Sequence, residues 1–287
     1  MTPGPGARPG RAEGPLMILE RVEHPRWLSN TWLLADGEGG AAVLVDAGGP
    51  AAAVRDLVAR VRARVSHILL THHHVDHAGE AADLARATGA VVCAHRLEMP
   101  LLGGGVARPL DDGEVLRSGG LEVRVLHIPG HTAGQAAFLA APAGGPVGPG
   151  DARGPAVVFT GDTLFRGSVG STTAPGHTTF ADLRRSIAGR LMTLPDAVTV
   201  APGHAAPTTI GAERAGNPFV RVMLGLEAEG TGTAEYSGRA ARLVVWGRDY
   251  DGGHKAWVRF ADGDEATVPG SRVRRPATFD PRPGATP

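Results

Sequence analysis

Residues 71–79 read Thr-His-His-His-Val-Asp-His-Ala-Gly, and this stretch does more than any other to decide the fold. The apolar residues 67–70 directly before it predict a buried strand. Residues 80–88 after it predict a helix that ends at Gly89. Four imidazoles and one carboxylate are therefore concentrated where a strand gives way to a helix. Imidazole and carboxylate together suit zinc, iron or nickel, whereas calcium and magnesium prefer an oxygen shell.

Three further apolar runs, residues 121–128, 157–160 and 198–200, predict strands that end shortly before a histidine or an aspartate. Active groups commonly lie on loops above a rigid sheet. We therefore expect the strands to share one sheet and their following side chains to converge at one edge. A catalytic zinc uses about three protein ligands and keeps one position for water. Enough side chains are available for two metals: His72, His74, Asp76, His77, His131, Asp162 and His204.

A histidine taken singly has an ordinary alternative interpretation. We expect four histidines outside these runs to be surface or capping residues: His24, His95, His177 and His254. If the run at 72–77 stood alone, it would be interpreted as a chance cluster of surface residues. Four sites in the same strand-to-loop setting favour a shared metal centre instead.

The four sites resemble the metal motifs of the metallo-β-lactamase superfamily. Residues 71–79 are similar to its His-x-His-x-Asp-His signature. Residues 129–134 (Pro-Gly-His-Thr-Ala-Gly) resemble its second motif, residues 160–165 (Thr-Gly-Asp-Thr-Leu-Phe) its third and residues 202–204 (Pro-Gly-His) its fourth. The resemblance extends over about residues 17–225, and the order and spacing of the motifs agree with the family.

Within the superfamily, residues 161–170 and 202–219 are similar to small bacterial glyoxalase II-like (hydroxyacylglutathione hydrolase-like) proteins. The resemblance implies an α/β fold, a four-layer αββα sandwich, for a catalytic domain at 17–228. The sequence departs from the family at residues 171–173, which read Ser-Thr-Thr where Arg-Thr-Asp is usual. Glutathione is therefore not assumed as the thiol of the substrate.

The resemblance also implies a role for each side chain. One set would hold the first metal: His72, His74 and His131. A second set would hold the other metal: Asp76, His77 and His204. Asp162 would bridge the two ions, and Asp46 would orient ligating imidazoles from outside the ligand set. His73 points away in an extended backbone and is left out. Zinc is the expected metal, with iron or manganese as alternatives.

The implied function is hydrolysis of a thioester or ester by a metal-bridging hydroxide, which Asp76 would orient as the catalytic residue. A thiolate or alkoxide leaves without a strong acid, so the reaction requires no separate general acid. Two alternatives stay open. One is a persulfide dioxygenase-like oxidoreductase with one iron on His72, His131 and Asp162. The other is a lactone or β-lactam hydrolase on the same scaffold.

Composition argues against several other classes. The 287 residues carry a formal net charge of zero, which argues against nucleic acid or anionic lipid as a partner and favours a small-molecule substrate. No apolar run approaches the ~20 residues that span a membrane, and residues 1–16 lack the apolar stretch of a secretory signal. We therefore expect a cytoplasmic protein. The single Cys93 excludes a disulfide within the chain and a cysteine-rich zinc site.

The C-terminal part predicts a separate small unit. We expect a linker at 229–238, a small all-β, SH3-like unit at 239–276 and disordered tails at 1–16 and 277–287. Three large apolar side chains are expected to form the core of that unit: Trp246, Trp257 and Phe260. The alternatives are that they form a face for self-association or partner binding, or that the unit packs against the metal domain and shapes the substrate mouth.

Overall fold

The computed structural model describes residues 17–103, 106, 108–144 and 156–275. The tails expected at 1–16 and 277–287 lie outside these residues. Within the described part of the chain, no helix combines the length and apolarity needed to cross a lipid bilayer.

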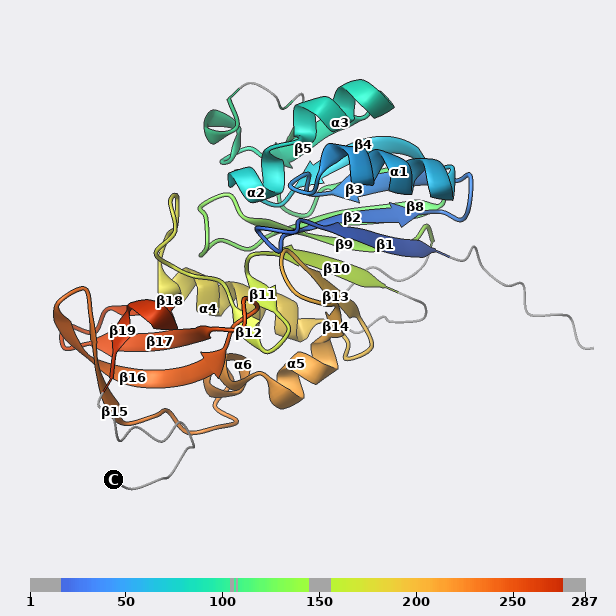
Figure 1. The fold of residues 1–287 in the computed structure, drawn as a ribbon. Helices are drawn as coiled ribbons and strands as arrows, with labels where there is room; N and C mark the ends of the chain where they lie inside the picture. Colours follow the sequence, from blue (N-terminus) through green and yellow to red (C-terminus); the bar gives the residue numbers. More distant parts are fainter. Residues whose placement is uncertain (1–16, 104–105, 107, 145–155, 276–287) are drawn as a thin grey trace, which may run out of the picture.

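Two six-stranded sheets form the centre of the protein (Figure 1). The strands of the first sheet, in spatial order, are β1 (Ile18–Glu23), β2 (Asn30–Ala35), β3 (Ala41–Val45), β4 (Arg64–Leu70), β5 (Val91–His95) and β6 (Arg108–Leu110). Those of the second sheet are β14 (Thr208–Thr209), β13 (Thr199–Pro202), β10 (Val157–Gly161), β9 (Ala136–Pro142), β8 (Leu121–His127) and β7 (Val115–Ser118). Parallel and antiparallel pairs occur in both sheets, as in β3–β4 and β8–β9.

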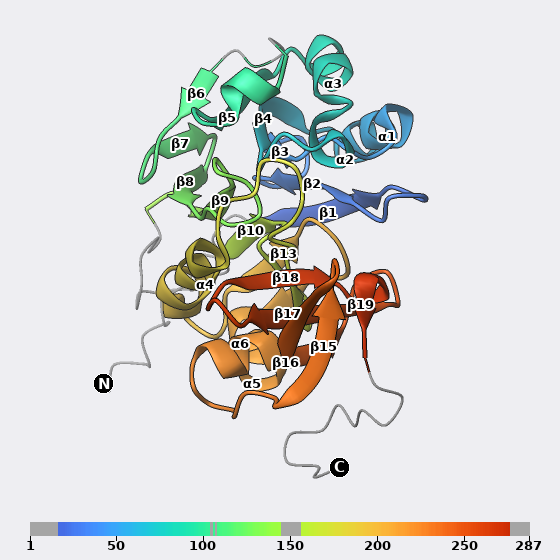
Figure 2. The same cartoon turned by 90° about the vertical axis from the view of Figure 1, so that its left-hand side faces the viewer.

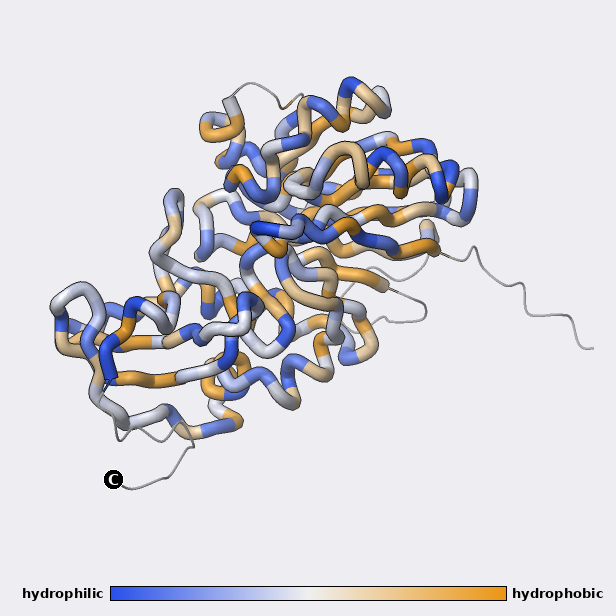
Figure 3. The backbone as a smooth tube through the Cα atoms, viewed as in Figure 1, coloured by the Kyte–Doolittle hydropathy of each residue, from blue (hydrophilic) through white to orange (hydrophobic). Residues whose placement is uncertain are grey.

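The helices cover the outer faces of the two sheets. Helices α1 (Ala51–Val61) and α3 (Ala81–Thr88) pack on the first sheet through one core. Helices α4 (Phe180–Gly189), α5 (Ile210–Gly216) and α6 (Pro218–Met223) pack on the second sheet through another. Alternate residues of the same strands meet in a third core between the sheets. The result is the expected α/β sandwich of four layers, with the apolar residues gathered along the strands and inward helix faces (Figure 3).

The expectation that the site-bearing strands share one sheet is wrong. β4 belongs to the first sheet, whereas β8, β10 and β13 belong to the second. The apolar pattern of a strand reveals that it is buried and carries no information about its partners, so facing sheets and a single sheet look alike in sequence. An isolated bridge between Ser29 and His204 joins the sheets at the end of the sandwich that carries the site.

The C-terminal part forms a five-stranded sheet of β18 (Glu265–Pro269), β17 (His254–Phe260), β16 (Arg239–Arg248), β15 (Gly232–Tyr236) and β19 (Val273–Arg274). Strand β15 lies inside the residues predicted as a linker, so the sheet begins earlier than expected. The Gly and Thr residues of 230–233 resemble a linker. Ala234 and Tyr236, however, alternate inward and are buried in the core of this unit.

This C-terminal unit packs against the second sheet and its helices (Figure 2). Trp257, expected in the core of the unit, is 1% exposed and belongs to the core shared with α4. Its ring lies 4.5 Å from that of Phe180, centroid to centroid. Phe260 does lie in the unit's own core, and Trp246 is half-buried against it. The unit is therefore an integral part of the molecule's packing.

Candidate metal centre

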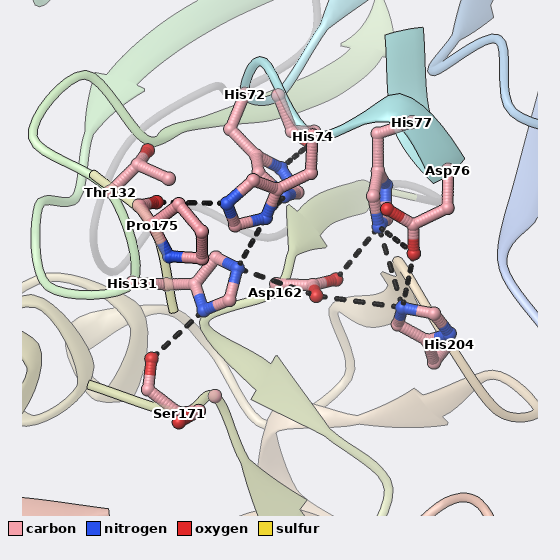
Figure 4. Close-up of polar contacts among 12 residues, drawn as sticks. His72, His74, Asp76, His77, His131, Thr132, Asp162, Ser171, Pro175 and His204 are labelled. Carbon is pink, nitrogen blue, oxygen red and sulfur yellow. Dashed lines mark hydrogen bonds and ion pairs between the residues drawn. The ribbon is translucent and has the colours of Figure 1, made fainter. Parts of the chain in front are cut away.

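The histidine-rich stretch forms a loop after β4 and then a one-turn helix, α2 (Val75–Ala78), before α3. The sequence had predicted a helix only from residue 80. Asp76 and His77 lie on α2, whereas His72 and His74 precede it (Figure 4). The two pairs of side chains meet His131, Asp162 and His204, which follow β8, β10 and β13, at one end of the sandwich (Figure 4).

The first group of side chains consists of His72, His74 and His131. The Nε2 atoms of His72 and His131 lie 2.9 and 3.0 Å from Nδ1 of His74. The outer nitrogen of each ring has its own partner, since His74 Nε2 lies 2.9 Å from the Pro175 carbonyl oxygen and His131 Nδ1 lies 2.9 Å from that of Ser171. When the outer ring nitrogen, which faces away from the centre, donates a hydrogen bond, the inner nitrogen of a neutral imidazole directs a lone pair towards the centre.

The second group consists of Asp76, His77 and His204. His77 Nε2 lies 3.4 Å from His204 Nε2, and Asp76 Oδ2 lies 3.6 and 3.5 Å from these two atoms. Asp162 stands between the groups. Its Oδ1 is 3.2 Å from His77 Nε2, and its Oδ2 is 3.6 Å from His131 Nε2. All seven predicted side chains are thus brought together, and the Asp162 carboxylate has an oxygen near a histidine of each group (Figure 4).

This donor set fits two metal ions. In the first group three inner nitrogens face one another while their outer nitrogens are satisfied, so at least two lone pairs converge without a proton donor. Asp162 Oδ1 is buried and makes no hydrogen bond among the described residues. Buried polar groups are normally satisfied. A cation between the converging imidazoles and this carboxylate would supply the partner that the oxygen lacks.

Close packing at the centre depends on Gly203. A Cβ atom at this residue would lie 2.3 Å from Asp162 Oδ1 and 2.8 Å from His77 Cε1. Neither neighbour can retreat without leaving its group. The residue before His204 must therefore be a glycine, because the loop after β13 passes very close to the side chains of the centre.

Asp46, at the end of β3, supports both groups from behind. Its carboxylate lies 2.9 Å from His77 Nδ1 and accepts hydrogen bonds from the backbone N–H and hydroxyl of Thr71. That hydroxyl lies 3.0 Å from His72 Nδ1, so Asp46 reaches His72 through Thr71. Asp46 is 1% exposed and has a φ of +60°, a conformation that costs a non-glycine residue energy. The sequence predicted this residue, but gave no sign of Thr71.

Glu98 is a supporting residue that the sequence analysis missed. Fully buried, it accepts hydrogen bonds from the His73 backbone N–H, the Thr132 hydroxyl and the Gly134 N–H at 2.9, 2.6 and 2.8 Å. It also pairs with the His73 ring, which points away from both groups as expected. Glu98 thereby ties the loop of His72 to the loop of His131. It belongs to no motif, so only the folded chain reveals it.

Charge and burial act differently on the two groups: they keep His72 and His131 neutral, whereas the Asp162 carboxylate favours a positive charge on His77 and His204, the place where a bound cation would sit. Burial and the neighbouring His77 hold the pKa of His72 well below its usual value. Burial lowers the pKa of His131 to about 4. Burial disfavours protonated His204, but the Asp162 carboxylate outweighs it and raises the pKa of His204 to about 9. Burial of Asp162 is in turn outweighed by His204 and His77, which keep its pKa well below the usual value.

One aromatic residue at the centre comes from the C-terminal unit and was not predicted. The ring of Tyr250, in the turn between β16 and β17, stacks on the His204 ring at 4.1 Å between centroids. Burial raises the pKa of the Tyr250 hydroxyl, and the Asp162 carboxylate raises it further, so the hydroxyl stays protonated. Tyr250 lies 46 residues beyond His204 and in no motif of the metal site, so the sequence offered no signal for it.

The chain was compared with known proteins. Residues 24–204 match the sequence profile of the metallo-beta-lactamase superfamily. A protein of Mycobacterium tuberculosis is 34% identical over 214 residues, which cover 67% of this chain and 92% of that protein. The hydroxyacylglutathione hydrolase GloC of Haemophilus influenzae is 29% identical over 222 residues, covering 71% of this chain and 98% of the relative.

Solved structures with the same fold include TTHA1623 in a di-iron-bound form, with 35% identity and a TM-score of 0.57 over 70% of this chain and 99% of that one. ETHE1 from Myxococcus xanthus has 28% identity and a TM-score of 0.57 over 73% of this chain and 91% of that one. The superfamily profile ends at residue 204, so it includes none of the C-terminal sheet.

Proposed function

Since the chain belongs to the metallo-β-lactamase superfamily, we propose that it is a dinuclear metal hydrolase of thioesters or esters, with glyoxalase II-like chemistry. The observation that carries the proposal is that six side chains form two separate groups of three, while a third set, His72, His77 and Asp162, joins one histidine of each group to the carboxylate between them. Similarity to a hydroxyacylglutathione hydrolase supports a thioester as the substrate class. The C-terminal sheet, with five antiparallel strands, supports the SH3-like description of that unit.

In this proposal each metal has its own ligand set. The first would be held by His72, His74 and His131, and the second by Asp76, His77 and His204. Asp162, between the two groups, would serve both. Zinc is the proposed metal, and the di-iron form of TTHA1623 keeps iron as an alternative. Bound divalent ions would lower the pKa of water towards ~7 and so supply a nucleophile at neutral pH.

Asp76 is proposed to orient the attacking water. Its side chain is 25% exposed, in contrast to the buried His77 beside it, so it faces the approach to the centre. Burial disfavours its charge, but the hydrogen bond from His204 outweighs burial and lowers the pKa of Asp76. The ionised carboxylate accepts a hydrogen bond from water and turns its lone pair towards the substrate carbonyl. A thiolate, with a thiol pKa of about 8.5, then leaves without a general acid.

The experiment is an activity panel on the metal-loaded protein, with thioester, ester, lactone, β-lactam and persulfide substrates. We expect thioesters or esters to be hydrolysed. Loss of a residue that only orients a metal ligand can lower activity by up to ~100-fold. His77→Ala removes a proposed ligand itself and should lower kcat/KM by more than that. His254→Ala, at an exposed histidine of the C-terminal unit, serves as the matched control and should leave kcat/KM unchanged. Oxygen consumption with the persulfide by a protein holding one iron would support the oxidoreductase alternative instead.

A further inference from the structure

The turn between β16 and β17 extends from the C-terminal unit to the metal centre. The ring of Tyr250 lies nearly parallel to that of His204, with 4.1 Å between centroids and 16° between planes. The ring also contacts Phe165, at 5.2 Å between centroids, and Phe165 lies 5.7 Å from the His204 ring, so the three rings form one cluster. Phe165 lies in β11 (Leu164–Phe165), three residues after Asp162. Tyr250 therefore forms part of the lining of the metal centre, although it belongs to the C-terminal unit and not to the catalytic domain.

Buried charges fix the position of this turn. Asp249 pairs with Lys255, the only lysine of the chain, at 2.9 Å, with side chains 6% and 5% exposed. The same carboxylate accepts hydrogen bonds from the Ser168 hydroxyl and the Tyr250 backbone N–H, at 2.9 and 3.0 Å. A buried ion pair adds little stability, but its satisfied geometry holds a segment in one place. Ser168 lies in β12 (Ser168–Val169) of the catalytic domain, so the turn is attached directly beside the centre.

A second attachment lies on the opposite side of the centre. Thr267 of β18 donates its N–H to the Thr172 hydroxyl and its own hydroxyl to the Gly170 carbonyl, at 3.0 and 2.6 Å. Its carbonyl accepts hydrogen bonds from the Thr172 N–H and the Ser171 hydroxyl, at 3.0 and 3.1 Å. The Ser171 carbonyl in turn meets His131 Nδ1. Ser171 and Thr172, two of the three residues at which the sequence departs from the glyoxalase II pattern, therefore hold the C-terminal unit in place.

We propose that the C-terminal unit forms one wall of the active site, and that the Tyr250 hydroxyl binds the substrate by donating a hydrogen bond to an oxygen of its acyl group. The inference rests on the proposed hydrolase function. Because its ring stacks on a residue of the second group, Tyr250 lies beside the proposed metals, where the acyl group of a substrate would have to bind in order to react. Among the described residues the hydroxyl has no hydrogen-bond partner, since only the backbone N–H of Tyr250 makes a hydrogen bond.

The test is Tyr250→Phe, which keeps the ring and its stacking and removes only the hydroxyl. The matched control is Tyr236→Phe, because Tyr236 is the other tyrosine of the chain and lies in the core of the C-terminal unit. We expect Tyr250→Phe to keep the metal content and melting temperature of the unaltered protein. Its kcat/KM for S-lactoylglutathione should fall about tenfold, the effect of one hydrogen bond. The Kd of D-lactate, measured by calorimetry on the metal-loaded protein, should rise by a similar factor.

Two results would overturn the proposal. In the first, Tyr250→Phe has a kcat/KM and a D-lactate Kd within about twofold of those of Tyr236→Phe, a much smaller change than the loss of one hydrogen bond would cause. The other is loss of metal from Tyr250→Phe, which would make Tyr250 a positioning residue for His204. If the unaltered protein hydrolyses neither thioesters nor esters, the proposed function fails, and the D-lactate measurement alone decides the role of Tyr250. No binding of D-lactate by the unaltered protein would then count against that role.

Discussion

At the residue scale, the metal centre depends on side chains that touch no substrate. Asp46 reaches His77 directly and His72 through Thr71, so one carboxylate orients a histidine of each group. The seven candidate ligands could be predicted because they follow apolar runs within four motifs, and Asp46 because its place at the end of a strand resembles that of a family residue. Glu98 and Tyr250 could not be predicted. Their contacts are with residues distant in sequence, and nothing in their own neighbourhood distinguishes them.

Asp46→Asn keeps the shape of the side chain and removes its charge. The amide cannot accept from both the imidazole of His77 and the hydroxyl of Thr71 as the carboxylate does. We expect a ~10–100-fold loss of metal affinity, as for other residues that orient a ligating histidine. Competition with a chromogenic chelator measures it, with the exposed Asp56→Asn on α1 as control. Equal affinity in the two variants would contradict the role given to Asp46.

Glu98→Gln tests the link between the loops of His72 and His131. Glu98 receives hydrogen bonds from backbone and side-chain donors, and glutamine would turn an N–H₂ group towards some of them. A buried donor left unsatisfied costs ~1–3 kcal/mol, so the free energy of unfolding should fall by about that amount. Denaturant unfolding measures it, with exposed Glu38→Gln as control. A variant as stable as the control would show that the link is dispensable.

At the scale of elements, the sequence identified strands better than it identified their partners. Residues 67–70 and 157–160 fall in β4 and β10, as predicted, and the strand predicted at 121–128 is β8, which ends one residue earlier, at His127. Their division between two facing sheets could not be predicted, because apolar periodicity reports burial alone. β15 was read as linker because glycine and threonine dominate its start. Its place in the sheet is determined by pairing with β16.

Lys255→Met tests whether the β16–β17 turn is held by its ion pair. Without the ammonium group, Asp249 keeps a buried charge with no cation beside it. Breaking such a pair costs ~3–5 kcal/mol, whereas removing both charges is far less costly. Lys255→Met should therefore lower the unfolding free energy, and the double variant with Asp249→Asn should recover most of the loss. A double variant less stable than Lys255→Met would contradict this account.

At the scale of the whole molecule, the two parts share a core. Val244, Val245 and Trp257 of the C-terminal unit are buried in one cluster with residues of α4 and α6. The sequence predicted a separate unit because a Gly- and Thr-containing stretch precedes it and its strands are short. The shared core could not be foreseen, since a large apolar residue fits the inside of a small unit and an interface equally well.

Trp257→Ala should destabilise the whole chain, not the C-terminal unit alone. Truncating a buried tryptophan costs ~3–5 kcal/mol, and here the cavity would border α4. We expect the unaltered protein to unfold in one transition followed by tryptophan fluorescence and circular dichroism, and the variant to unfold in one transition at lower denaturant. Two separate transitions in the unaltered protein would show that the parts fold independently.

The central claim is that residues 72–77 divide between two metals. Metal content per chain, measured by mass spectrometry on the unaltered protein and on His77→Ala, tests it most directly. The account predicts two metal ions per chain in the unaltered protein and one in the variant, because the proposal assigns His77 to the second metal and leaves the three histidines of the first group intact. A single iron per chain in the unaltered protein, unchanged in His77→Ala, would contradict it.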